Sequence, residues 1–218
     1  QAVAAIDRAG ESSLHEFVGR VAPQLIALWA LATLALLPVM PWLFGVLTGS
    51  RFADGQVVLQ VLLIAVPGAI TTHVYGVAHF AQGRLGTANI GLFGVKLFVN
   101  FAVSLALLPT LGVVGSAVGS AVSYLVLQWL FLFDQHRHLH VPFGSAARVL
   151  VLAHAAGIAL AFTPNGPWRL VVAAAALVVL VHSIRRRELF SPAEVSALMP
   201  ARLKNVVPAA ARMLCRES

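Results

Sequence analysis

Residues 87–108, TANIGLFGVKLFVNFAVSLALL, and residues 113–133, VVGSAVGSAVSYLVLQWLFLF, are two long apolar blocks separated by a four-residue segment. Each is close to the length of α-helix, about 20 residues, that crosses the ~30 Å hydrocarbon core of a bilayer. Lipid cannot hydrogen-bond to an exposed backbone, so a continuously apolar block of this length is expected to be helical. The blocks do not alternate in polarity, which argues against strands of a transmembrane barrel. The pair predicts two membrane-spanning helices.

Four further blocks have the same character, at residues 21–47, 57–81, 147–162 and 169–184. Across the 218 residues, 59% are hydrophobic and 11% are charged, whereas soluble domains carry about 25% charged residues. We therefore predict an all-α, polytopic transmembrane bundle with about six spans.

Basic residues are distributed unevenly between the segments that connect these blocks. One alternating set of segments contains twelve Lys and Arg residues and the opposite set contains two, Arg51 and Arg169. Because basic residues concentrate in cytoplasmic loops, both ends of the chain are predicted to lie in the cytoplasm. The twelve are Arg8, Arg20, Arg84, Arg137, Arg148, Arg185, Arg186, Arg187, Arg202, Lys204, Arg212 and Arg216.

The spans and charges divide the chain into four predicted parts. Residues 1–20 form a cytoplasmic segment, residues 21–135 contain four spans, residues 136–184 contain two more, and residues 185–218 form a basic cytoplasmic tail. In the tail, Ser191 followed by Pro192 and Glu194 has the pattern of a helix start with a capping box. The chain begins with Gln1, and we expect it to be the rear portion of a longer protein.

The net charge of +7 is explained by basic loops that contact anionic lipid headgroups, so no nucleic-acid partner is expected. The one cysteine, Cys215, lies in the tail and offers neither a disulfide nor a supported catalytic thiol. The sequence 136–140, HRHLH, resembles a metal-binding tract, but a basic loop facing headgroups is the better interpretation. We expect no metal, no cofactor and no enzyme, because no catalytic constellation has supporting context.

Lys96 is the one Lys or Arg that falls deep inside a predicted span and not at its end. It lies ~15 Å into the span at 1.5 Å per residue, where a charge costs at least ~2.5–3.5 kcal/mol and should face protein or water. Asn89 and Asn100 fall within about 40° of Lys96 around the helix axis. This polar stripe favours a cavity wall that binds an anionic or hydroxyl-rich substrate; packing against neighbouring helix carbonyls is the alternative.

The second span repeats the pattern more weakly, with Gln60, Thr71 and Gln82 on one side and Arg84 just beyond its end. Pro67 and Gly68 interrupt this span, which is typical either of a helix that exposes backbone to a cavity or of a simple proline kink. His73 and His79 lie off the stripe and are interpreted as hydrogen-bonded packing residues.

Small residues dominate the start of the fourth span. Gly115 and Gly119 form a GxxxG motif, which permits close contact between two membrane helices. We expect this face to pack against another helix of the same bundle.

Several of these motifs occur in a recognisable order. A Gln-Gly-Arg turn at 82–84 precedes Asn89, and Asn100 precedes the stretch LPTLGVVGSA at 108–117. This order resembles the C-terminal region of polysaccharide biosynthesis exporters, the lipid-linked oligosaccharide flippases of the multidrug/oligosaccharidyl-lipid/polysaccharide superfamily. The resemblance covers about residues 20–135, and residues 145–184 would match the extra helix pair of fourteen-helix members.

The resemblance implies a function in the bacterial inner membrane. Members of the family move undecaprenyl-diphosphate-linked sugars between leaflets for polysaccharide export, and a preceding N-terminal lobe would supply the other wall of the central cavity. The implied partners are the lipid-linked oligosaccharide and membrane lipids. The candidate substrate-binding residues are Lys96, Asn89, Asn100, Gln60, Thr71, Gln82 and Arg84. A multidrug exporter of the same superfamily and a membrane-embedded transferase are the alternatives; the first usually requires an intramembrane carboxylate, and no predicted span contains one.

Overall fold

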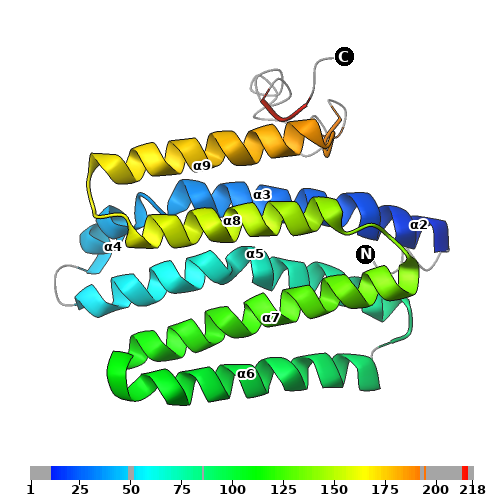
Figure 1. Ribbon diagram of the computed structural model, residues 1–218, viewed down its shortest axis with the longest axis horizontal. Helices are drawn as coiled ribbons and strands as arrows, with labels where there is room; N and C mark the ends of the chain where they lie inside the picture. Colours follow the sequence, from blue (N-terminus) through cyan, green and yellow to red (C-terminus); the bar gives the residue numbers. More distant parts are fainter. Residues whose placement is uncertain (1–10, 49–51, 85, 192–193, 195–212, 216–218) are drawn as a thin grey trace.

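The computed structural model describes residues 11–48, 52–84, 86–191, 194 and 213–215, and all regular structure within these ranges is helical. Six helical segments are long and apolar enough to cross a membrane. They run back and forth along one common axis (Figure 1). The predicted fold class, an all-α polytopic membrane bundle, is therefore confirmed.

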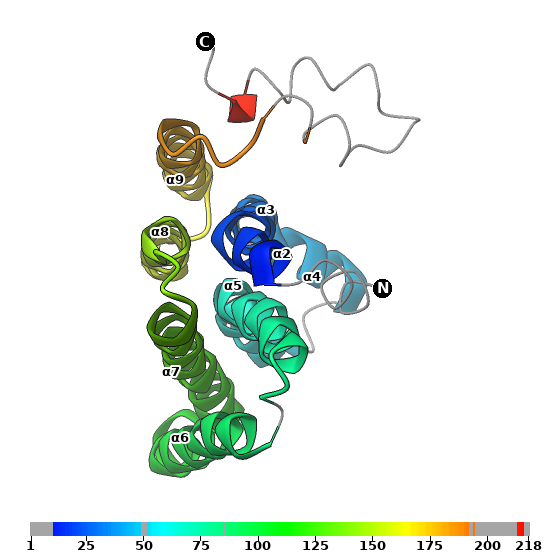
Figure 2. The same ribbon diagram turned by 90° about the vertical axis from the view of Figure 1, so that its right-hand side faces the viewer.

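The helices form two layers. Viewed along their axes, α9, α8, α7 and α6 follow one another along one side, and α3 and α5 pack beside this row (Figure 2). The core lies where α3 meets α5 and α8, around the fully buried side chains of Ile26, Leu34 and Leu150, and extends to Leu127 of α7. The last helix pair thus packs directly on α3. The bounds are α3 Ala22–Leu36, α5 Ala53–Ala81, α6 Thr87–Leu111, α7 Val113–Leu139, α8 Gly144–Phe162 and α9 Pro167–Arg186.

The first span differs from its predicted extent. It begins before Val21, because α2 (Glu11–Glu16) and a π-helical turn (Phe17–Val21) continue directly into α3. It ends at Leu36, and a separate helix, α4 (Met40–Thr48), follows a turn. Pro38 accounts for the end of α3, since proline has no N–H to continue the helical hydrogen bonds beyond Leu37, whose backbone is still helical. The span comprises Ser13–Leu36 instead of residues 21–47.

Two other predictions about helix continuity were wrong. The α7 helix continues past Phe133 to Leu139, so Asp134 and His136–His138 belong to a helix and not to a loop. The α5 helix is not broken at Pro67, which lies inside it. Prolines inside membrane helices are tolerated where neighbouring groups bond to the freed backbone.

The connections at one end of the bundle contain most of the described basic residues. The α5–α6 turn, the α7–α8 connection and the end of α9 lie together at that end (Figure 1), with Arg84, Arg137 and Arg185–Arg187 nearby. At the opposite end, Arg169 is 4% exposed and donates to Asn165 Oδ1 and to the Leu37 carbonyl. The asymmetry in charge therefore coincides with the two ends of the bundle.

The predicted capping box is present at the start of the tail. Glu194 N–H donates to Ser191 Oγ at 3.3 Å, and Ser191 N–H donates to Glu194 Oε2 at 2.7 Å. Burial raises the pKa of Glu194, but the hydrogen bonds from Ser191, Gln24 and Arg20 more than offset it and lower that pKa to about 2. This tail start is held against α3 and the π-helical turn. The predicted helix beyond it, and residues 1–10, lie outside the described residues.

Candidate functional site

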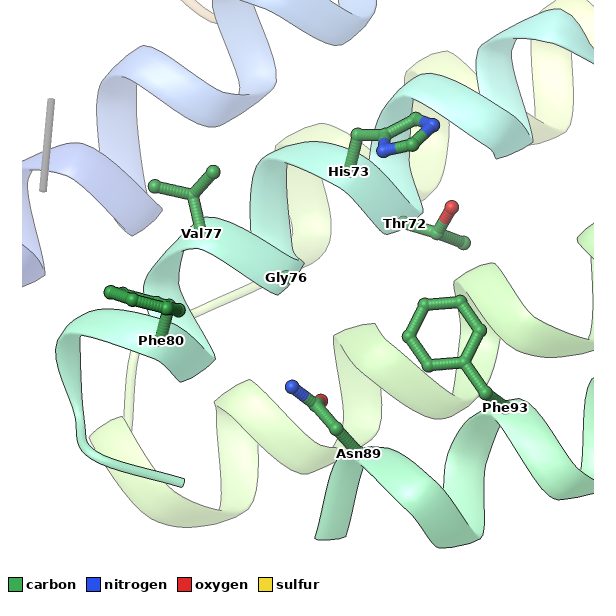
Figure 3. Close-up of a pocket in the computed structure, with 7 residues that line it drawn as sticks. All are labelled: Thr72, His73, Gly76, Val77, Phe80, Asn89 and Phe93. Carbon is green, nitrogen blue, oxygen red and sulfur yellow. The ribbon is translucent and has the colours of Figure 1, made fainter. Parts of the chain in front are cut away.

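A groove with a volume of about 360 Å³ lies between α5 and α6. Figure 3 shows the seven residues that line it, five from α5 and two from α6. Its walls are mainly apolar, with a few polar groups among them, the composition typical of sites that bind small amphipathic molecules. The lining residues are Thr72, His73, Gly76, Val77, Phe80, Asn89 and Phe93.

The groove exists because α6 packs chiefly against α7 and diverges from α5. Gly115 and Gly119 of α7 lie against the α6 backbone: a Cβ on Gly119 would be 2.9 Å from the Asn100 carbonyl oxygen, and one on Gly115 would be 2.7 Å from that of Leu107. The prediction that the GxxxG face packs on another helix of the bundle is confirmed. On the other side, a Cβ on Gly76 of α5 would meet nothing within 4 Å.

A polar cluster closes one end of the groove, where α5, α6 and α7 meet. His79 of α5 is fully buried. Its Nδ1 lies 2.8 Å from Asn89 Oδ1 of α6, and its Nε2 lies 2.8 Å from Asp134 Oδ2 of α7. The second contact is an ion-pair distance without the alignment of a directed hydrogen bond. One imidazole therefore contacts polar groups from two other helices.

Asp134 organises the rest of this cluster. Arg84, in the α5–α6 turn, donates to both oxygens of Asp134, at 2.7 and 3.1 Å. This two-pronged geometry suits a guanidinium and a carboxylate. His138, one turn further along α7, lies 3.3 Å from Asp134 Oδ1. Beside them, Gln82 donates to Gln135 Oε1 at 2.9 Å.

The sequence did not predict that Asp134 and His79 belong to one site. The predicted fourth span stops at Phe133, where the apolar block ends, yet α7 continues to Leu139 and keeps the Asp134 carboxylate within a spanning helix. A signal was present in the sequence: Asp134, His138 and the Gln82–Arg84 turn are all polar groups at the same predicted membrane face. His79 was expected to be a hydrogen-bonded packing residue, and it is hydrogen-bonded, but to polar groups of a charged cluster.

The seven predicted site residues occupy three different places. Asn89, Gln82 and Arg84 lie in the cluster at the end of the groove, and Asn89 also lines the groove. Lys96 and Asn100 lie along the α6–α7 contact. Gln60 and Thr71 are buried on α5, where the Thr71 hydroxyl donates to the Pro67 carbonyl at 2.7 Å.

Lys96 faces α7. Its Nζ lies 3.8 Å from the centroid of the Tyr124 ring, the geometry of a cation–π contact. One turn further along α6, Ser104 donates to Asn100 Oδ1 at 3.1 Å. The stripe that contains Lys96 and Asn100 is therefore partly occupied by contacts with α7 and within α6.

A second buried histidine lies deeper in the bundle. His154 of α8 lies 3.0 Å from the Ile64 carbonyl of α5 and 3.0 Å from Gln128 Oε1 of α7. The Ile64 carbonyl is three residues before Pro67, where proline disturbs the helical hydrogen bonds. His154 thus bonds to α5 backbone next to this disturbed turn and to a side chain of α7, which makes it a structural tie between three helices.

Within the described ranges, no three His, Cys, Asp or Glu side chains are grouped closely enough to hold a metal ion. In the 136–140 tract, His136 Nδ1 lies 3.0 Å from the Val141 carbonyl, and His138 contacts Asp134. These histidines cap the end of α7.

No protein-family model, curated protein or solved structure matches this chain.

Proposed function

We propose that this chain is part of a transporter that flips a lipid-linked oligosaccharide, an undecaprenyl-diphosphate sugar, across the bacterial inner membrane for polysaccharide export. The observation that carries the proposal is the groove between α5 and α6, which combines apolar walls with a polar end. A lipid-linked sugar has the same two parts: a long hydrocarbon tail and a polar, anionic head.

Each part of such a substrate has a matching surface. Val77, Phe80 and Phe93 offer apolar walls for a hydrocarbon chain. Asn89 lines the groove where the Arg84 cluster begins, and can bond to sugar hydroxyls or phosphate oxygens. The substrate class itself comes from the motif order in residues 82–117. The groove offers a binding site for a substrate of that class.

Lys96 is the cation proposed to attract the diphosphate. Among the described residues, the Tyr124 ring is the one group that makes a cation–π contact with the Lys96 ammonium. A cation–π contact is worth about 0.5–2 kcal/mol, whereas a lysine at this depth costs at least ~2.5–3.5 kcal/mol. The Tyr124 contact therefore leaves the ammonium incompletely stabilised, and its three N–H donors can still bind an anion.

The test is export in cells whose surface polysaccharide depends on the full-length protein. Lys96→Met keeps roughly the length of the side chain and removes its charge, so it should abolish or strongly reduce export without lowering the amount of protein in the membrane. Lys96→Arg should keep part of the export. Tyr124→Leu, which removes the ring but not the cation, is the matched control for packing and should preserve export.

Two outcomes would contradict the proposal. Normal export with Lys96→Met would show that the ammonium does not bind the substrate. Loss of the protein itself in Lys96→Met would support a packing role, especially if Tyr124→Leu had the same effect.

A proton-coupled multidrug exporter is the second candidate. It is favoured by one observation, the carboxylate of Asp134 inside the α7 span and next to His79. Such an exporter would expel lipophilic cationic dyes from vesicles in response to a pH gradient, and Asp134→Asn would stop it. A flippase would instead leave dye transport at the background level.

A further inference from the structure

His79 is the point at which the two walls of the groove are tied together. It belongs to α5, which forms one wall, and it bonds to Asn89 of α6, which forms the other. Among the described residues, this is the one side-chain hydrogen bond that joins α5 to α6. Beyond it the two helices diverge around the groove (Figure 3).

The other contacts of α6 allow it to move relative to α5. It packs against α7, and its outer face is apolar and exposed, with Ile90 at 72% and Phe98 at 74%. In Figure 2, α6 lies at the end of the row of helices, next to α7. A shift of α6 relative to α5 therefore involves the bond between His79 and Asn89 together with the packing of α6 on α7.

The bond between His79 and Asn89 depends on the proton count of the imidazole. Both atoms that face the ring, Asn89 Oδ1 and Asp134 Oδ2, are acceptors. A protonated ring carries a hydrogen on each nitrogen, so it can donate from Nδ1 to Asn89 while its positive charge is attracted to Asp134 at ion-pair distance. A neutral ring has one hydrogen, and a carboxylate attracts it more strongly than an amide oxygen does. Loss of the proton should therefore release Asn89 and leave the ring on Asp134.

We propose that His79, with Asp134 and Asn89, forms a proton-binding site that acts as a latch on the groove: binding of a proton ties α6 to α5, and its release opens the groove. This inference goes beyond the proposed function, because it concerns how the groove opens and not which molecule it holds.

The charged groups around the ring are compatible with a site that gains and loses one proton. From α7, Asp134 faces the imidazole, and His138 contacts the far side of that carboxylate. From the α5–α6 turn, Arg84 neutralises the same carboxylate. From α6, Asn89 is the group in contact, and it is uncharged. Phe131 of α7 packs on the ring, with centroids 4.9 Å apart, and limits access of water.

The test is a distance measurement on the full chain in lipid nanodiscs. Spin labels at Phe98→Cys on α6 and Val179→Cys on α9, in a Cys215→Ser background, report the position of α6 relative to the far end of the row. Both sites are exposed, at 74% and 52%. The distance distribution should differ between about pH 5 and about pH 8, the interval in which a histidine changes charge.

Three variants identify the group responsible. His79→Gln cannot bind the proton and should give one distribution at both pH values. Asn89→Leu removes the α6 side of the latch and should give the high-pH distribution at both. His73→Gln is the matched control, since His73 is a histidine of the same helix that lines the groove but lies outside the cluster, and it should keep the shift.

The proposal is overturned if the distance distribution of the labelled protein without further substitution does not change with pH. It is also overturned if the distribution still changes with pH in His79→Gln. It is also overturned if Asn89→Leu keeps the low-pH distribution at pH 5, because the Asn89 bond would then not hold α6. If His73→Gln abolishes the shift, the proton that controls the distance binds at His73 and not at His79, and the proposal is likewise refuted.

Discussion

Replacing Gly119 with alanine should force α6 and α7 apart. The new Cβ would lie 2.9 Å from the Asn100 carbonyl oxygen and 2.9 Å from the Ser104 nitrogen, and it would overlap the Ser104 hydroxyl. Ordinary contacts begin at 3.4 Å, so the two backbones would have to separate by about 0.5 Å, with loss of close packing along the interface. The groups in the way are mainly backbone, which cannot rotate aside.

The size of the effect follows from three contributions. Overpacking costs about 1–3 kcal/mol, and disturbance of the Ser104–Asn100 hydrogen bond about 0.5–1.5 kcal/mol. Alanine returns about 1 kcal/mol through its higher helix propensity. The net expected loss is about 0.5–3.5 kcal/mol, or about 1–14 °C in Tm by the relation for soluble chains of this length.

The assay is thermal unfolding of the purified chain in detergent, followed by circular dichroism. Gly94→Ala is the matched control, because it makes the same chemical change on α6 at a site where a Cβ meets nothing within 4 Å. It should leave Tm unchanged or raise it. If Gly119→Ala and Gly94→Ala unfold at the same temperature, the close α6–α7 contact does not contribute as argued.

Three further predictions concern topology, the tail and the buried histidine. In a Cys215→Ser background, cysteines at Thr110 and Trp168 should react with an impermeant reagent from outside the cell and one at Gly144 should not; reversed labelling would contradict the predicted orientation. Because the pKa of Glu194 is lowered to about 2 from an ordinary value of about 4.3, the stability that it contributes to the tail start is present above the ordinary value and is lost as pH falls toward 2. Hydrogen-exchange protection of the Ser191 amide should follow that loss, and Glu194→Gln, which lacks the charge, should abolish the dependence. His154→Leu leaves the Ile64 carbonyl and the Gln128 amide without their partner and should cost about 1–3 kcal/mol, whereas exposed His182→Leu should cost little; equal Tm values for the two variants would disprove the structural role of His154.

Much of the local structure could be predicted from the sequence. Hydropathy located six spans because the cost of placing backbone and charge in lipid acts on each segment separately. The Gly115–Gly119 spacing predicted a close helix contact, and Ser191 with Glu194 predicted a capping box, because both depend on residues within one turn of each other. The predicted helix ends were less accurate where a polar residue follows an apolar block. The α7 helix continues through Asp134 because Arg84 and His79 stabilise its carboxylate.

The arrangement of the site was decided by the tertiary structure. The spacing of Asn89, Lys96 and Asn100 predicted a polar stripe on α6. It did not predict that Asn89 bonds to His79 or that Lys96 contacts Tyr124. Those partners depend on how each helix is rotated about its axis and on which neighbour it packs against, and both are set by the whole bundle. The sequence by itself determined which segments enter the membrane; only the packing of α5, α6 and α7 placed a histidine, a carboxylate and an amide from three helices around one point at the end of a groove.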